Sequence, residues 1–176
     1  MKQLKIIVLL TLAVSFSYCN QSSKKQNSQT NQENSPIEIT ESNGMNSCYL
    51  AVLGKDSVKL ELVTTKDKFK GFMHYKFFET DNSIGTYEGI LSGDTLKGIY
   101  RLLSEGIISY SEKYFLLKDN QLLEGVGEIE FPNDSTVKFK DPGRLTYGES
   151  INLEKVDCKE NFIPKEIKKF YEEFVE

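Results

Sequence analysis

The stretch LSGDTLKGIY, residues 91–100, decides the fold, because it resembles either a phosphate-binding loop or a tight turn. A phosphate loop needs a helix directly after its glycines. The residues that follow here, LKGIYRLL, instead alternate between apolar and polar side chains, as in a strand. Gly93 and Asp94 form an accepted pair for a two-residue hairpin turn, since glycine adopts a positive φ without strain. We therefore expect a turn here and no nucleotide site.

The residues that face each other across this hairpin support the turn. With the loop at Gly93 and Asp94, the facing pairs are Leu91 with Leu96, Gly89 with Gly98, Tyr87 with Tyr100, and Gly85 with Leu102. All of these are glycine, leucine or tyrosine, whereas the alternate positions are mixed and mostly polar. A pattern that agrees on both strands is expected of the correct register.

Short apolar runs divided by turn residues continue on both sides of this hairpin. The expected strands cover 49–53, 58–64, 69–78, 84–92, 95–103, 107–118, 122–131 and 136–140, with a ninth possible within 144–157. This spacing is typical of an all-β sandwich or barrel. Glycines that recur on one face fit a strongly curled sheet. We predict an all-β, antiparallel up-and-down meander that forms a small barrel of about eight strands over residues 47–160.

Two more turns, at Lys66-Asp67 and at Asp119-Asn120, extend the register to the neighbouring strands. The side chains then expected inside the barrel are Val58, Leu60, Leu62, Gly71, Met73, Tyr75, Phe77, Tyr87, Gly89, Leu91, Leu96, Gly98, Tyr100, Tyr110, Tyr114, Leu116, Leu123, Gly125, Ile129 and Phe131. By contrast His74, the only histidine, is expected to point outward.

Tyrosines on this inner face suggest a ligand site, since tyrosine combines an apolar body with a polar tip. The candidate residues are Tyr75, Tyr87, Tyr100, Tyr110, Glu112 and Tyr114. A buried carboxylate is costly without a partner, so three readings of Glu112 stay open: it anchors a polar ligand, it lies at the rim, or the register slips by one residue there. A barrel of eight strands can hold one small ligand or be filled by its own side chains, and both readings stay open.

The C-terminal residues 161–176 change period. Apolar side chains at 163, 167, 170, 171 and 174 predict an amphipathic helix, with Pro164 in its first turn. Two pairs at i,i+4 spacing, Lys168 with Glu172 and Lys169 with Glu173, would lie on its wet side. We expect this helix to pack on the barrel or over one of its mouths. A helix lying on a membrane surface would have a more basic polar face.

Residues 1–18 are typical of an export signal, because a short basic start precedes an apolar run too short to span a bilayer. Cys19 follows directly and is expected to carry lipid, although Tyr18 is larger than the residue usual before a lipidated cysteine. Ordinary cleavage after Ser17 is the alternative. Residues 20–46 are polar and are predicted to form a disordered tether that would hold the domain off a membrane.

The three cysteines fit this view. If Cys19 carries lipid, Cys48 and Cys158 remain as one pair at the two ends of the folded part. An exported protein meets an oxidising compartment, so we predict a disulfide between them. Two unrelated buried thiols are the alternative. Neither has a neighbouring Cys or His at metal-ligand spacing.

The charge and the residue types narrow the possible functions. Removal of residues 1–18 takes away two lysines and no acids, which leaves 20 basic against 26 acidic residues. Such a balance argues against a nucleic-acid partner. One histidine gives neither a zinc set nor a Ser-His-Asp arrangement. Glu124, Glu128 and Glu130 are expected as a stripe on an outer face that guards a sheet edge. We expect no enzyme activity, no cofactor and no metal.

The cysteine after the signal, the polar tether, the β-hairpin meander and the terminal helix together resemble uncharacterised bacterial lipoproteins of lipocalin-like shape. A looser resemblance is to the N-terminal barrel of the copper-response lipoprotein NlpE, whose CxxC pair is missing here. The resemblance implies an envelope lipoprotein, anchored to a membrane, whose barrel binds a small apolar or amphipathic ligand or an envelope protein. The alternative is a structural or inhibitory envelope protein with a filled core. Fold likeness alone transfers no activity.

Overall fold

A computed structural model describes residues 44–176, so the predicted signal peptide, Cys19 and the tether up to residue 43 lie outside the described residues. In the described part the elements are β1 (Met45–Leu53), β2 (Asp56–Thr65), β3 (Lys68–Lys76), β4 (Ser83–Ser92), β5 (Thr95–Ser104), β6 (Ile107–Lys118), β7 (Gln121–Val126), β8 (Ile129–Asn133), β9 (Thr136–Phe139), the short 3-10 helix η1 (Pro142–Arg144), β10 (Thr146–Val156) and α1 (Lys165–Val175). β1 begins at Met45, two residues before residue 47, where the barrel was expected to begin.

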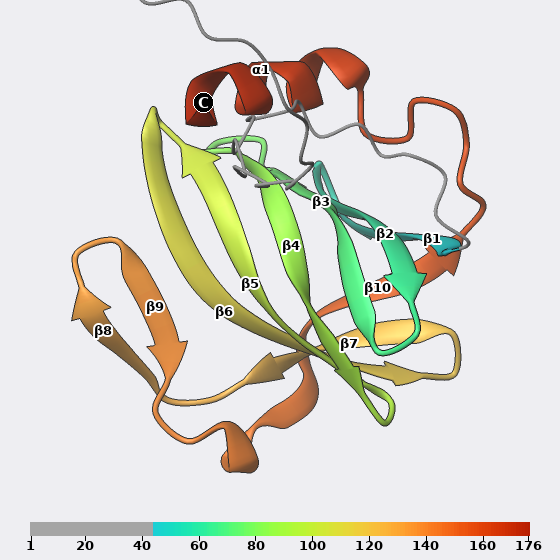
Figure 1. The fold of residues 1–176 in the computed structure, drawn as a ribbon, viewed down its shortest axis with the longest axis vertical. Helices are drawn as coiled ribbons and strands as arrows, with labels where there is room; N and C mark the ends of the chain where they lie inside the picture. The colour runs from blue at the N-terminus through green and yellow to red at the C-terminus, as the bar shows by residue number, and fades with distance from the viewer. Residues whose placement is uncertain (1–43) are drawn as a thin grey trace, which may run out of the picture. The chain divides into compact units, whose positions relative to one another are not determined.

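Eight of the strands form an antiparallel barrel, in the order β1 to β7 and then β10, which pairs with β1 (Figure 1). The predicted all-β barrel with a C-terminal helix is therefore confirmed. The run expected as a single strand at 122–131 is two strands, β7 and β8. The β8–β9 hairpin lies outside the barrel, where β9 pairs in parallel with the first half of β6. In the sequence, this hairpin separates β7 from β10, the strand that completes the barrel.

The opening hairpin has the predicted register. β4 and β5 pair Leu91 with Leu96 and Tyr87 with Tyr100, and the turn glycine, Gly93, has a φ of 59°. The turn at Lys66-Asp67 also gives the expected pairs, such as Leu60 with Met73. In these strands the inward residues are those that the sequence pattern indicates.

The predicted inner face is wrong for β6 and β7. The β5–β6 turn at Glu105-Gly106 places Ser111 opposite the buried Tyr100, and this puts Lys113 and Phe115 inside the barrel. The residues expected inside that instead lie on the outer side of this part of the wall are Tyr110, Tyr114, Leu116, Leu123 and Gly125. Two others expected inside, Ile129 and Phe131, are exposed on β8. The predicted pairing of Leu116 with Leu123 is nevertheless correct, since pairing alone does not say which face is buried.

The barrel interior is filled by its own side chains. Those with at most 2% of their surface exposed are Val58, Leu60, Met73, Tyr87, Tyr100, Phe115, Leu122 and Leu153. They come from seven of the eight barrel strands and belong to one packed cluster. Gly98 allows this close packing, because a Cβ there would lie 2.8 Å from ring atoms of both Phe69 and Tyr87.

Helix α1 packs on the outer wall of the barrel, across β3 to β6 (Figure 1). Ile167, Tyr171 and Val175 contact apolar side chains of that wall. Tyr171 also donates a hydrogen bond to the backbone oxygen of Arg101 at 3.1 Å. Of the two expected ion pairs along the helix, Lys169 with Glu173 is present at 3.4 Å. Lys168 instead pairs with Glu61 of β2, so this lysine holds the helix to the barrel.

The predicted disulfide between Cys48 and Cys158 is confirmed. Cys48 lies in β1, and Cys158 follows β10, the strand paired with β1 at the point where the barrel closes. The two cysteines are 110 residues apart in the sequence. The bond therefore links the first and last strands and fixes the start of the segment that leads to α1.

Candidate functional site

Three of the candidate tyrosines meet inside the barrel. The rings of Tyr75 and Tyr100 lie 5.8 Å apart between centroids. Tyr100 donates a hydrogen bond to the backbone oxygen of Met73 at 3.1 Å, and Tyr87 donates one to that of Lys113 at 3.0 Å. These two hydroxyl groups already have partners within the wall, so they serve the core rather than a bound molecule.

Burial raises the pKa of Tyr75, Tyr87 and Tyr100, because a phenolate has no water to solvate it in this core. The charge of Glu124 raises the pKa of Tyr75 further. All three side chains therefore stay neutral over the physiological range. They lack the lowered pKa expected of a tyrosine that acts as a base or nucleophile.

The other three candidates, Tyr110, Glu112 and Tyr114, lie on the outer wall of β6. One carboxylate oxygen of Glu112 accepts from the hydroxyl of Tyr114 at 3.0 Å, and the other accepts from the backbone N–H of Phe139 at 2.9 Å. The rings of Tyr114 and Phe139 are also in contact, with centroids 5.6 Å apart. Glu112 thus finds its partners in β6 and β9, where it holds the β8–β9 hairpin to the barrel.

Burial raises the pKa of Tyr114 to about 12, and its hydrogen bond to Glu112 adds to this effect. The six candidates therefore form no single site, because only three of them share the interior. Their role in binding a ligand stays a prediction. The prediction that all six face inward is wrong for Tyr110, Glu112 and Tyr114.

An ion pair that the sequence pattern did not indicate lies inside the barrel, between β6 and β7. Lys113 forms a salt bridge with Glu124, and Glu124 also accepts a hydrogen bond from Ser150 at 3.0 Å. The amino group of Lys113 lies 5.4 Å from the centre of the Tyr75 ring. Glu124 was expected in an outer stripe with Glu128 and Glu130, but it is 7% exposed and faces inward. A register drawn from the Glu105-Gly106 turn would have indicated the inward positions of β6.

This ion pair also contacts the part of the barrel wall where strand pairing is least regular. Between Tyr147 and Asn152, β10 loses its regular register with β7, and Ser150 belongs to that segment. The contact with Glu124 thus holds the segment to the barrel where ladder hydrogen bonds are missing. Both charges have partners, so the pair fits a structural role.

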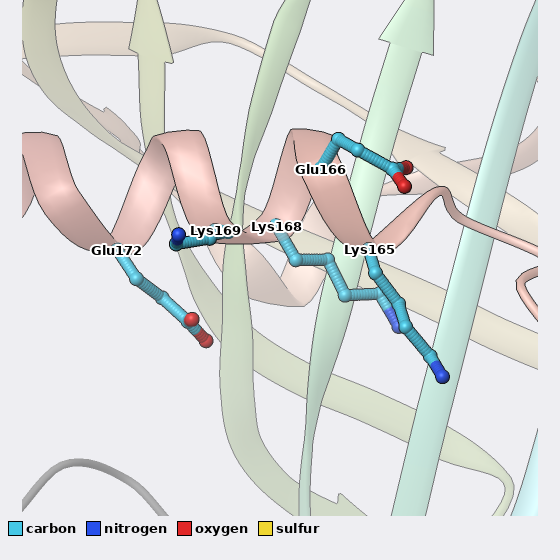
Figure 2. Close-up of a pocket in the computed structure, with 5 residues that line it drawn as sticks. All are labelled: Lys165, Glu166, Lys168, Lys169 and Glu172. Carbon is cyan, nitrogen blue, oxygen red and sulfur yellow. The ribbon is translucent and has the colours of Figure 1, made fainter.

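Two surface hollows lie outside the barrel. One runs along α1 and is lined by Lys165, Glu166, Lys168, Lys169 and Glu172. Figure 2 shows these side chains spread along the helix rather than converging on one point. The other lies beside the β1–β10 seam and is lined by Leu50, Asn120, Lys155, Val156, Asp157, Lys159 and Phe162. Both are open, so neither encloses a small molecule.

No family model, curated protein or solved structure matches this chain. Within residues 44–176, no group of His, Cys, Asp and Glu side chains is arranged to hold a metal ion. In the same residues no helix has the length and apolar character needed to cross a bilayer. The geometry of the described residues is therefore the basis for any functional proposal.

Proposed function

We propose that this protein is an envelope lipoprotein, anchored through lipid on Cys19, whose filled β-barrel acts through its outer surface by binding another protein. The observation that carries the proposal is the packed interior, where Tyr87 and Tyr100 occupy the space that a ligand would need. A carrier of small molecules keeps a concave and largely preformed site. A structural or inhibitory role therefore fits better than transport of a ligand.

The proposed location in the cell envelope is supported by the disulfide between Cys48 and Cys158, because such bonds persist where the environment is oxidising. The apolar run before Cys19 and the polar residues after it fit export followed by anchoring. Domain and anchor would then be joined by residues 20–43.

A binding surface is offered by β8, the strand at the free edge of the β6–β9–β8 extension (Figure 1). Every residue of β8 is exposed, including Ile129 and Phe131. Lys140 donates a backbone hydrogen bond to Glu128, so alternation along the strand turns the backbone groups of Ile129, the next residue, away from β9. Free edge groups beside apolar side chains suit a partner that adds an extended segment to the sheet.

Native mass spectrometry of the protein purified from its own host tests the filled barrel. We expect the mass of the processed chain with its lipid and no further small molecule. A small molecule that leaves only when the protein is denatured would overturn the proposal of surface binding.

Membrane fractionation tests the anchor separately. We expect the wild type in the membrane fraction and the Cys19→Ser variant in the soluble fraction. If both variants are soluble and begin at Tyr18, cleavage follows Ser17 and the anchor proposal is wrong. This result would leave the filled barrel unaffected.

Cross-linking in living cells tests the binding surface. A photo-reactive amino acid at Phe131 should give a covalent adduct with another protein. The same amino acid at Glu149, an exposed residue of β10, is the matched control and should give none. Adducts at both positions or at neither would show that β8 is not the binding surface.

A further inference from the structure

Helix α1 has more apolar surface than the barrel covers. Phe170 is 59% exposed and Phe174 46% exposed, although both belong to the apolar pattern that predicted the helix. Their rings lie 6.4 Å apart between centroids. Phe174 also lies beside the β5–β6 turn, where its ring comes within 4.0 Å of the position that a Cβ on Gly106 would occupy. Ile107, the next residue, is 63% exposed.

These three side chains, Ile107, Phe170 and Phe174, form a surface that we call the helix aromatic patch. Exposed apolar residues are common singly, but a group of large ones usually marks an interaction site. A lipid surface is a poor match for it. The helix carries Lys165, Lys168 and Lys169 but also Glu166, Glu172 and Glu173, and an interfacial helix has a predominantly basic polar face.

The charges beside the patch favour a second copy of this chain. Lys169 and Glu173 each precede one phenylalanine and lie along the same flank of the aromatic stripe. When two identical helices pair antiparallel about a two-fold axis, the same flank of each helix faces the other. Lys169 of one copy then meets Glu173 of the other, and the contact occurs twice.

We propose that the protein forms a homodimer in which two α1 helices pack antiparallel through the helix aromatic patch. The apolar side chains supply the association, and the two Lys169–Glu173 contacts select the antiparallel orientation. The dimer is weak in solution because the patch is small. Anchoring both copies in one membrane would strengthen it by raising their effective concentration, a point that rests on the proposed function.

Sedimentation analysis of the processed chain with Cys19→Ser tests this dimer over a wide range of concentrations. We expect a monomer–dimer equilibrium that is abolished by the combined Phe170→Ser and Phe174→Ser substitutions. The proposal would be overturned if the protein with Phe170 and Phe174 intact stayed monomeric at all concentrations, or if it associated only with lipid vesicles. Circular dichroism would show that the double variant is folded.

Charge reversal tests the orientation. Lys169→Glu or Glu173→Lys places like charges together twice and should weaken the dimer at least about tenfold. The combined Lys169→Glu and Glu173→Lys variant restores opposite charges and should dimerise like the wild type. Glu172→Lys changes the net charge as Glu173→Lys does, but lies about 100° around the helix from it, and should leave the dimer unchanged. Equal weakening by Glu172→Lys and Glu173→Lys would refute antiparallel pairing.

Discussion

The two halves of the barrel differ in how their strands are built. Strands β2 to β5 are joined mostly by tight turns, and their interior is almost wholly apolar. Strands β6, β7 and β10 include a displaced hairpin, a loss of register between Tyr147 and Asn152, and the Lys113–Glu124 ion pair inside the wall. An apolar pattern therefore specifies a strand's buried face only where that face is consistently apolar.

The largest expected effect comes from cutting the covalent link between the first and last barrel strands. The combined Cys48→Ser and Cys158→Ser variant should lose about 4 to 5 kcal/mol of unfolding free energy, because the bond closes a loop of 110 residues in the unfolded chain. Urea unfolding measures the loss. Cys19→Ser alone should unfold like the wild type. A loss below about 1 kcal/mol would mean that the seam between the halves is stable without the bond.

The inverted face of β6 can be tested with neighbouring residues. Phe115 is fully buried and packs against Tyr87, with ring centroids 5.7 Å apart, whereas Leu116 lies on the outer side. Phe115→Ala should lower the unfolding free energy by about 3 to 5 kcal/mol, and Leu116→Ala by about 1 kcal/mol. Denaturant unfolding of both variants gives the comparison. If Leu116→Ala proved the more damaging, the inner face first predicted from the sequence would be right after all.

Much of the fold was accessible from the sequence because tight turns fix pairing. Gly93-Asp94 and Lys66-Asp67 gave the correct partners and the correct face, since apolar residues alternate cleanly in those strands. The face of β6 was predicted from the turn at Asp119-Asn120, which gave the correct pairing of Leu116 with Leu123 but not the buried face. Tyr114 on the predicted face packs on the outer wall against Phe139 of the hairpin instead. Lys113 and Glu124 were not expected inside, because burial of each charge is favourable only with the other beside it. Sequence alone does not show that they meet.

The Lys113–Glu124 ion pair lies inside the half of the barrel formed by β6, β7 and β10, whereas the interior of β2 to β5 is almost wholly apolar. Lys113→Met would leave Glu124 buried with only Ser150 as a side-chain partner, and should cost about 3 kcal/mol of unfolding free energy. The combined Lys113→Met and Glu124→Leu variant should regain most of that loss, because apolar replacements of both partners need no compensating charge. Thermal and urea unfolding of the two single variants and the double variant form a complete cycle. Additive losses would show that the two charges do not act as a pair.

The smallest change in stability is expected for His74, which lies in β3 on the outer face of the barrel wall, as predicted. It is 9% exposed, and burial lowers its pKa, with the charges of Lys59 and Lys76 lowering it further. The unfolded chain therefore binds a proton at a higher pH than the folded chain does, so stability falls as the pH drops below about 6.5.

Comparison of wild type with His74→Gln isolates this contribution from that of the carboxylates, which titrate in both proteins. Between pH 7.5 and 5, the wild type should lose more unfolding free energy than the variant, by about 1 kcal/mol or less. Urea unfolding at several pH values measures the difference. Parallel pH profiles would mean that His74 takes up its proton as easily in the barrel wall as in water.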